Sequence, residues 1–306
     1  MLRQLILAAS RDGRVKAVVA GAPLSRGVVR RFVSGESVED AVRTASGLAA
    51  HGLQVSIDHL GEDTLDAGQA ESTVKAYLLL LDRLAAAGLT AGGRSEVSVK
   101  LTAVGSAIDP GLALDNARTI CEAARAAATT VTLDMEDHTT TDATLLALHE
   151  LRRDFPGTGA VLQAYLRRTE ADCRDLAGAG SRVRLCKGAY KEPPSVAFQG
   201  AREVDRAYVR CLGVLMAGDG YPMVASHDPR LIAIAGALAA GRPAGSYEYQ
   251  MLFGIRPLEQ QRLADAGETV RVYVPYGDEW YGYLMRRLAE RPANLGFFMR
   301  ALASRS

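Results

Sequence analysis

Eight short runs rich in Val, Leu and Tyr recur along the chain from residue 53 onward. Runs of this composition are typical of strands buried in a parallel sheet. Each is separated from the next by a longer stretch, and several of these stretches have the apolar period of a helix. The predicted strands are Leu53–Asp58, Glu96–Thr102, Thr130–Glu136, Ala160–Leu166, Arg182–Gly188, Pro222–His227, Ser246–Leu252 and Val270–Pro275.

The stretches between the runs carry helix start and stop signals. A helix is expected over Ser72–Leu89, with Ser72 as its cap and a glycine near its end. Two more are expected over LDNARTICEAARAAA and DATLLALHELRRDF, and Asp228–Gly241 begins with an Asp-Pro cap. A further helix, Ser37–Gly52, precedes the first strand.

Strands that alternate with helices over short connections indicate an α/β protein with a parallel sheet. Eight such units favour closure into a (βα)8 barrel, and a doubly wound open sheet is the alternative. The barrel domain is expected over residues 51–306. Residues 1–50 are expected to form an N-terminal helical extension that caps the amino-terminal side of the barrel.

The charge and composition limit the kinds of partner that are expected. The 306 residues include 36 Lys and Arg and 35 Asp and Glu, so neither nucleic acid nor an anionic membrane is expected as the main partner. The four cysteines form no C-x-x-C pair, which favours reduced thiols in a cytoplasmic protein. No apolar run approaches the roughly 20 residues that span a bilayer, although peripheral contact with a membrane stays open.

Polar residues gather where the predicted strands end, which is where barrel enzymes carry their chemistry. Lys100, Arg184 and Lys187 are the notable ones, because each follows or interrupts an apolar strand. A buried cation needs a carboxylate or a bound anion. Pairing with Asp134 or Glu248 would explain one of them. The number of cations favours an anionic ligand or cofactor.

The stretch YGYLMRRLAER adds Arg286 and Arg287 to these cations. Adjacent helical residues point about 100° apart, so the two arginines cannot form one flat charged face. Either they are solvated on an outer helix, or both reach around a single anion. Other chemistry has less support, since H-E-x-x-H, G-x-S-x-G and the Rossmann fingerprint are all absent. No metal site is expected.

Several stretches together resemble the proline dehydrogenase family, FAD-dependent barrels that oxidise L-proline. They are VSIDHLGE, VSVKLTA, TLDMED, VLQAYLRR, RLCKGAYKE, ASHD, YEYQMLFGI, VRVYVPYG and YLMRRLAER, in family order from about residue 50 to the end. The resemblance implies a distorted barrel whose last helix lies over the mouth. The chain has no room for an aldehyde dehydrogenase domain, so it resembles the single-function bacterial form.

The resemblance also implies roles for residues at matching positions. It places the carboxylate of proline on Arg286, Arg287 and Lys100. Tyr273 would lie over the substrate ring, and Tyr190 and Leu252 would form other walls.

Asp134 matches the active-site aspartate of the family, and Arg184 matches the arginine beside the flavin N5 atom. Glu62 matches an acid that can pair with Arg286 as a gate over the substrate. The remaining matches are to FAD contacts, namely Met135, Gln163, Lys187, Gly188, Ala189, Ser226 and His227. The family often has alanine in place of Met135 and threonine in place of Ser226.

The activity that the resemblance implies is oxidation of L-proline to 1-pyrroline-5-carboxylate by hydride transfer to FAD. Electrons would pass to a quinone, with 1-pyrroline-5-carboxylate dehydrogenase as a channelling partner. Three competing hypotheses remain: another flavin barrel such as a folate reductase, a metal-dependent barrel hydrolase, and a non-catalytic scaffold. Proline and hydroxyproline are not distinguished by the sequence.

Overall fold

The computed structural model of the chain describes residues 29–290, with side chains described up to residue 285. Eight parallel strands form a closed barrel in the order β1 to β8, so the predicted fold class is confirmed and the open sheet is excluded. The strands are β1 Gln54–His59, β2 Ser95–Val99, β3 Val131–Leu133, β4 Gly159–Gln163, β5 Arg182–Cys186, β6 Tyr221–Ala225, β7 Glu248–Leu252 and β8 Val270–Tyr276.

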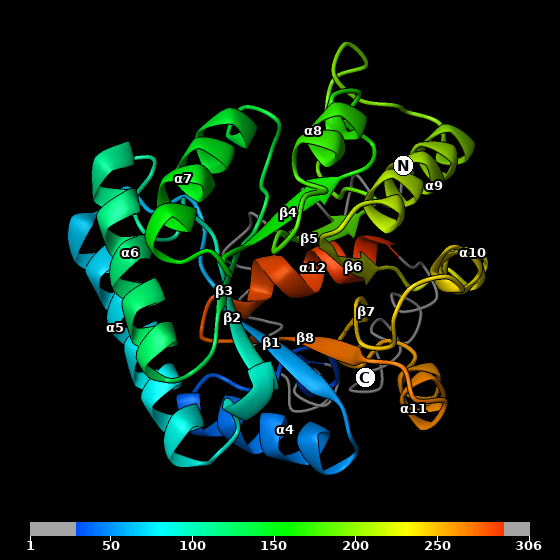
Figure 1. The fold of residues 1–306 in the computed structure, drawn as a ribbon. Helices are drawn as coiled ribbons and strands as arrows, with labels where there is room; N and C mark the ends of the chain where they lie inside the picture. Colours follow the sequence, from blue (N-terminus) through cyan, green and yellow to red (C-terminus); the bar gives the residue numbers. More distant parts are fainter. Residues whose placement is uncertain (1–28, 291–306) are drawn as a thin grey trace, which may run out of the picture.

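Helices follow the strands around the outside of the barrel (Figure 1). Those that connect consecutive strands are α5 Ala67–Ala86, α6 Pro110–Ala126, α7 Thr141–Asp154, α8 Thr169–Asp175, α9 Ala201–Ala217, α10 Pro229–Ala239 and α11 Pro257–Asp265. The described part of the chain holds two more long helices, α4 Val38–Ala50 and α12 Trp280–Glu290.

Helix α4 occupies the outer position between β8 and β1. It contacts both strands and α5. Just before it, the Ser34 amide donates to the Pro275 carbonyl (3.0 Å), so the helix starts near the carboxyl end of β8. Helix α4 then runs back to the start of β1 at Gln54. Helix α4 therefore forms part of the barrel wall, and the remainder of the predicted N-terminal extension, residues 1–28, lies outside the described residues.

With that outer position taken, α12 lies elsewhere. It begins at Trp280, just past the carboxyl end of β8, and Figure 1 shows it crossing the ring of strands. Its first residues are buried, including Tyr281, Tyr283, Leu284 and Met285. The last helix therefore lies over the barrel mouth, as the resemblance implied.

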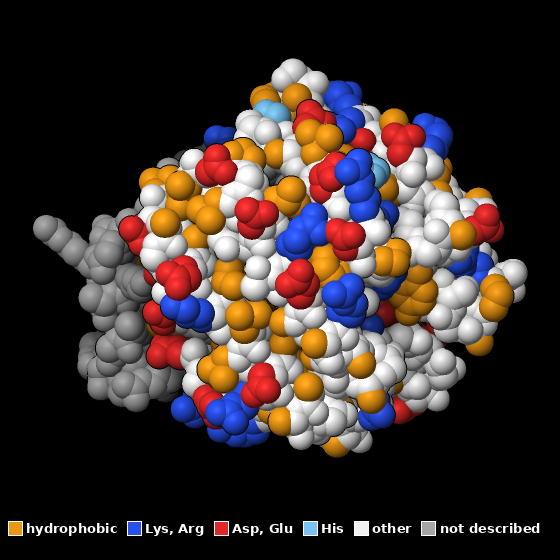
Figure 2. Space-filling view, turned by 60° about the vertical axis from the view of Figure 1, so that its left-hand side comes forward, with side chains coloured by type: hydrophobic (Ala, Val, Ile, Leu, Met, Phe, Trp, Pro, Cys, Tyr) orange, Lys and Arg blue, Asp and Glu red, His pale blue; other side chains and the backbone are white. Residues whose placement is uncertain are grey.

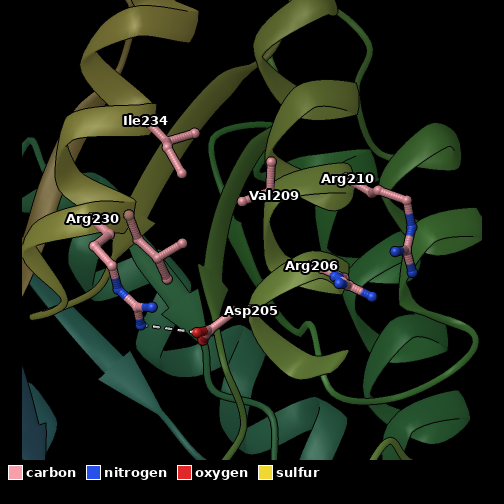
Figure 3. A pocket seen from close by; sticks show the side chains of 7 residues that line it. Asp205, Arg206, Val209, Arg210, Arg230 and Ile234 are labelled. Atoms are coloured by element: carbon pink, nitrogen blue, oxygen red, sulfur yellow. Dashed lines mark hydrogen bonds and ion pairs between the residues drawn. The ribbon is translucent and has the colours of Figure 1, made fainter. Parts of the chain in front are cut away.

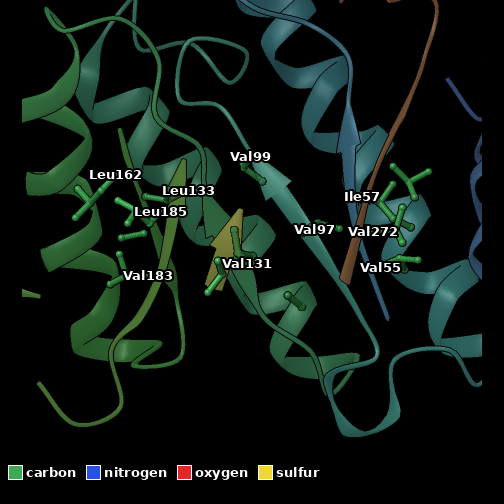
Figure 4. Packing of buried hydrophobic residues seen from close by; sticks show 14 of the residues in the cluster. Val55, Ile57, Val97, Val99, Val131, Leu133, Leu162, Val183, Leu185 and Val272 are labelled. Atoms are coloured by element: carbon green, nitrogen blue, oxygen red, sulfur yellow. The ribbon is translucent and has the colours of Figure 1, made fainter. Parts of the chain in front are cut away.

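The apolar residues of the strands alternate with polar ones. Val55, Ile57, Val97 and Val99 face the helices, and Figure 4 shows these residues in the layer between strands and helices. Because strand side chains alternate between the two faces, the intervening Ser56, Asp58, Glu96 and Ser98 point into the barrel. The main hydrophobic core is thus a shell around the barrel, whereas the inside is largely polar.

One predicted helix start is wrong. Helix α5 begins at Ala67, and its cap is Asp66, whose side chain accepts from the Gln69 amide (2.9 Å). Ser72 lies inside the helix, where its hydroxyl donates to the Gly68 carbonyl (2.8 Å). Aspartate and serine are comparable caps, so the apolar pattern after Ser72 did not reveal the earlier turn.

The surface has no dominant charge on the face shown in Figure 2, where acidic and basic side chains are interspersed. No described helix has the length and apolar content needed to cross a membrane. The four cysteines are free thiols, and all except Cys186 are buried.

Candidate functional site

Arg184, on β5, lies at the centre of a hydrogen-bonded cluster inside the barrel and is only 4% exposed. The guanidinium donates to Ser56 (2.8 Å), Ser98 (2.8 Å), Asp134 (2.7 Å), Glu96 (3.2 Å) and Gln250. Planar guanidinium groups suit such multiple fixed bonds. Five partners on β1, β2, β7 and the end of β3 leave the side chain one orientation.

Asp134 and Tyr273 continue this cluster toward the mouth. One carboxylate oxygen of Asp134 accepts from Arg184, and the other accepts from the Tyr273 hydroxyl (2.7 Å). The Arg184 guanidinium carbon lies 5.3 Å from the centre of the Tyr273 ring. Burial and the neighbouring Asp134 raise the pKa of Tyr273 well above its usual value, so the phenol stays a hydrogen-bond donor. The three predicted site residues thus form one unit.

Lys100 follows β2 and is paired with Asp58 of β1. The ammonium donates to both carboxylate oxygens, at 2.7 and 2.8 Å, and both residues are buried. Burial alone would lower the pKa of Lys100, but Asp58 and Asp134 outweigh it and raise that pKa. Lys100 is therefore a fixed cation, with one of its three donors not used by Asp58.

A second charged layer lies deeper in the barrel. Glu96 pairs with Arg182 and with Arg184 (3.2 Å), and Glu248 pairs with Arg271 (2.8 Å). Burial favours protonated Glu96, but the arginines outweigh it and hold the pKa of Glu96 well below its usual range. This layer supports Arg184 from below.

The three cations singled out in the sequence all have carboxylate partners within the chain. Lys100 pairs with Asp58, Arg184 with Asp134, and Lys187 with Asp205 (2.6 Å) and Asp228 (3.2 Å). Pairing within the chain therefore explains all three of these cations, and the argument from the number of cations now depends on Arg286 and Arg287, whose side chains lie outside the described residues. Asp58, Glu96 and Asp205 were not named as partners, and an anionic ligand must be supported on other grounds.

The signal for the missed residues was the alternation along each strand. Glu96, Ser98 and Lys100 occupy every second position, as do Glu248 and Gln250 on β7. A period of two places such residues on one face, here the inner one.

The predicted cofactor residues lie at or just past the ends of β3 to β6. Gly188 has a φ of +108°, and a Cβ there would lie 2.2 Å from the Tyr165 ring, so only glycine fits. The side-chain amide of Gln163 donates to the backbone carbonyl of Glu136 (2.7 Å). Ser226 accepts from the Asp228 amide (3.1 Å) through its hydroxyl.

The other predicted residues have these positions. His227 accepts from the Leu252 amide (2.9 Å) through Nε2, which fixes its ring. Met135 is buried, Ala189 is exposed, and Tyr190, Leu252 and Glu62 are half-buried. The side chains of Arg286 and Arg287 lie outside the described residues, so their contact with one anion stays a prediction.

A groove of about 430 Å³ lies on the outer surface between α9 and α10 (Figure 3). Val209 and Ile234 form part of its apolar lining, and Arg230 donates to Asp205 (3.0 Å) at one end. Asp205 also pairs with Lys187, so the groove adjoins one of the residues predicted to contact a cofactor. Among the described residues no group of three or more His, Cys, Asp or Glu could hold a metal ion.

Glu136 is a buried carboxyl at the mouth with an unusual pKa. Burial raises its pKa to about 7, although the Thr102 hydroxyl and amide both donate to it. Because the pKa of Glu136 is higher in the folded protein than in the unfolded chain, the contribution of Glu136 to the unfolding free energy is complete below about pH 4. It is lost as the pH rises through 7.

We expect the unfolding free energy of the wild type, relative to Glu136→Gln, to fall by ~3 kcal/mol between pH 4.5 and pH 8. Glutamine keeps the shape but does not titrate, so the other carboxyls cancel in the comparison. Urea unfolding at several pH values measures the difference. If the difference in unfolding free energy between the two proteins stays constant over this pH range, the pKa of Glu136 is not raised.

A closed barrel with fixed ionic and polar side chains at the carboxyl ends of its strands defines an α/β-barrel enzyme. The profile of the family described as proline dehydrogenase matches residues 41–300. Proline dehydrogenase 1 of Bacillus subtilis is 38% identical, over 89% of this chain and 90% of that protein. The proline dehydrogenase of Deinococcus radiodurans is 37% identical, over 90% of each. The chain belongs to the proline dehydrogenase family.

A solved structure agrees with this placement. Proline utilization A from Bdellovibrio bacteriovorus, inactivated by N-propargylglycine, superposes with a TM-score of 0.81 at 26% identity. The match covers 92% of this chain but 34% of that one, so the chain spans about a third of the larger protein.

Proposed function

We propose that this protein oxidises L-proline to 1-pyrroline-5-carboxylate, with FAD as the hydride acceptor. The observation that carries the proposal is the Arg184–Asp134–Tyr273 unit beside Lys100 at the mouth of a barrel of this family. It supplies a fixed cation, a hydrogen-bond donor and an aromatic surface within one buried site. That combination suits a small amino acid and a flat redox cofactor.

The residues at the mouth fit a flavin. The left-handed backbone at Gly188 lets a ligand approach the chain closely, and Lys187 is a cation at the same edge. Arg184 would offer positive charge to the negative charge of a reduced flavin. We propose Met135, Gln163, Ala189, Ser226 and His227 as further contacts. FAD bound there would supply a hydride acceptor for the carbon beside the proline nitrogen and would pass the electrons to a quinone.

We propose that Lys100, Arg286 and Arg287 bind the carboxylate of proline. Arginine forms paired, charge-assisted bonds with carboxylates, and Lys100 has a donor that Asp58 does not use. Tyr273, Tyr190 and Leu252 would form walls around the ring, and Glu62 would close over it by pairing with Arg286. The buried start of α12 supports this placement, because the same helix carries both arginines.

The proline nitrogen must lose its proton before the carbon–nitrogen double bond forms, since a protonated nitrogen has no lone pair to donate. The residues of the chain then orient the ring and exclude water. The product would pass to 1-pyrroline-5-carboxylate dehydrogenase, in keeping with the bifunctional PutA relatives. We propose a cytoplasmic location, with peripheral contact at the inner face of the membrane where a quinone is available.

The absorption spectrum of the purified protein tests the proposal. We expect flavin bands, and we expect anaerobic L-proline to bleach them. A flavin protein that ignores proline and is reduced by a nicotinamide donor would indicate a folate reductase type instead. A colourless protein that chelators inactivate would indicate a hydrolase, and one that binds neither flavin nor metal would indicate a scaffold.

A further inference from the structure

The loop between β1 and α5, residues 60–66, is held to the barrel at several points. The Leu60 amide donates to the Tyr276 carbonyl (2.8 Å), and Asp66 caps α5 at the other end. Between these ends, the Asp63 amide donates to the Thr102 hydroxyl (3.1 Å) and the Thr64 amide to the Thr102 carbonyl (3.1 Å). Thr102 therefore fixes the middle of the loop, next to Glu62.

Thr102 is in turn held by Glu136. The Thr102 amide donates to one carboxylate oxygen of Glu136 (3.2 Å), and the Thr102 hydroxyl donates to the other. Thr102, Glu136 and Thr64 are all buried, at 6%, 5% and 2% exposed. The hydroxyl uses its proton for Glu136 and a lone pair for the Asp63 amide, so the two bonds need the same rotamer.

The loop conformation requires such support. Asp63 has a φ of +55°, in the left-handed region that a residue with a side chain seldom adopts. Strain of this kind persists where surrounding contacts determine the backbone. Here the contact is the Asp63 amide on Thr102, one residue after Glu62.

We propose that Glu136, acting through Thr102, is a positioning residue that holds the loop in the conformation from which Glu62 closes over the substrate. The inference rests on the proposed function, since it assumes that Glu62 forms a gate over bound proline. Glu62 also acts electrostatically on both Lys100 and Glu136. Its carboxylate therefore lies near the lysine proposed to bind proline and near the glutamate that holds Thr102. Loosening the support should weaken proline binding without changing the reacting groups.

Thr102→Val tests this, because valine keeps the shape and the backbone bonds but removes the hydroxyl. We expect amide hydrogen exchange in the peptide that spans residues 60–66 to become about tenfold faster. We expect the KM for proline to rise about threefold or more, with kcat changing less than twofold. Thr102→Ser restores the hydroxyl and should return both values close to those of the wild type.

Thr141→Val is the matched control. Thr141 is also buried, and its hydroxyl has no hydrogen-bond partner within residues 29–290, so the same substitution should leave exchange and KM unchanged. Glu136→Gln is the second variant and should also speed exchange, because glutamine has one oxygen and cannot accept from both the Thr102 hydroxyl and the Thr102 backbone amide.

Unchanged exchange in both Thr102→Val and Glu136→Gln would overturn the support itself. Faster exchange with an unchanged KM would overturn the positioning role. Hydrogen exchange needs no turnover, so the support can be judged even if wild-type protein fails to oxidise proline, which would instead refute the proposed function.

Discussion

Arg184→Lys is expected to lower the reduction potential of the bound flavin by on the order of 30 mV or more, which is about tenfold for a two-electron couple. Lysine keeps the positive charge but cannot donate to Ser56, Ser98, Asp134 and Gln250 together, so the charge is no longer held in one place. We expect the rate of proline oxidation to fall about a hundredfold, since fixed charge is worth most in a buried site. Redox titration and single-turnover reduction by proline measure the two effects.

Arg271 provides the matched control for this experiment. It is as buried as Arg184, at 4% exposed, and it pairs with Glu248, in the deeper layer. Arg271→Lys should therefore cost a similar amount of stability without moving the flavin potential. An equal shift of the potential in both variants would mean that Arg184 acts through the fold, and an unaltered potential in Arg184→Lys would remove its proposed role at the flavin.

The fold could be predicted because each strand carries its own signal. Valine and leucine at every second position mark the side that packs on helices, and all eight predicted strands overlap observed ones. The position of α4 could not be predicted in this way. Val38, Ala41 and Ala45 show that α4 has one buried face but not which surface covers it. Only the contact with β1 and β8 shows that it takes the outer place that frees α12 for the mouth.

The sequence predicted which polar residues belong to the site but not how they pair. Arg184, Asp134 and Lys100 were visible as polar residues at strand ends, and the structure brings Arg184 and Asp134 into contact. Their partners Glu96 and Asp58 were not assigned, because pairing inside a barrel depends on the register of neighbouring strands. Asp58 lies opposite Ser98 on β2, which brings Lys100 within reach two residues later. A single sequence shows how polar and apolar residues alternate along each strand, but it does not show how neighbouring strands are aligned.

Lys100→Met is expected to weaken strongly the preference of the enzyme for a carboxylate on its substrate. In the wild type, L-proline should be oxidised far faster than L-prolinamide, whose neutral amide gains little from Lys100, Arg286 and Arg287. We expect kcat/KM for proline to fall about a hundredfold or more in Lys100→Met, while the value for prolinamide changes little. Arg287→Ala should narrow the preference in the same way, and an unchanged preference in Arg287→Ala would show that this arginine does not bind the carboxylate.

Stability separates the role of Lys100 in binding from its role in the fold. Lys100→Met leaves Asp58 buried without its cation, and Asp58→Asn leaves Lys100 without its anion, so each should cost ~3–5 kcal/mol of unfolding free energy. The double variant buries no unpaired charge at this pair and should cost clearly less than the sum of the two single variants. The carboxylate preference should nevertheless stay weakened in the double variant, because restored stability does not return the Lys100 cation to the mouth. If the preference returned together with stability, Lys100 would be a structural residue, and recognition of the carboxylate would rest on α12 alone.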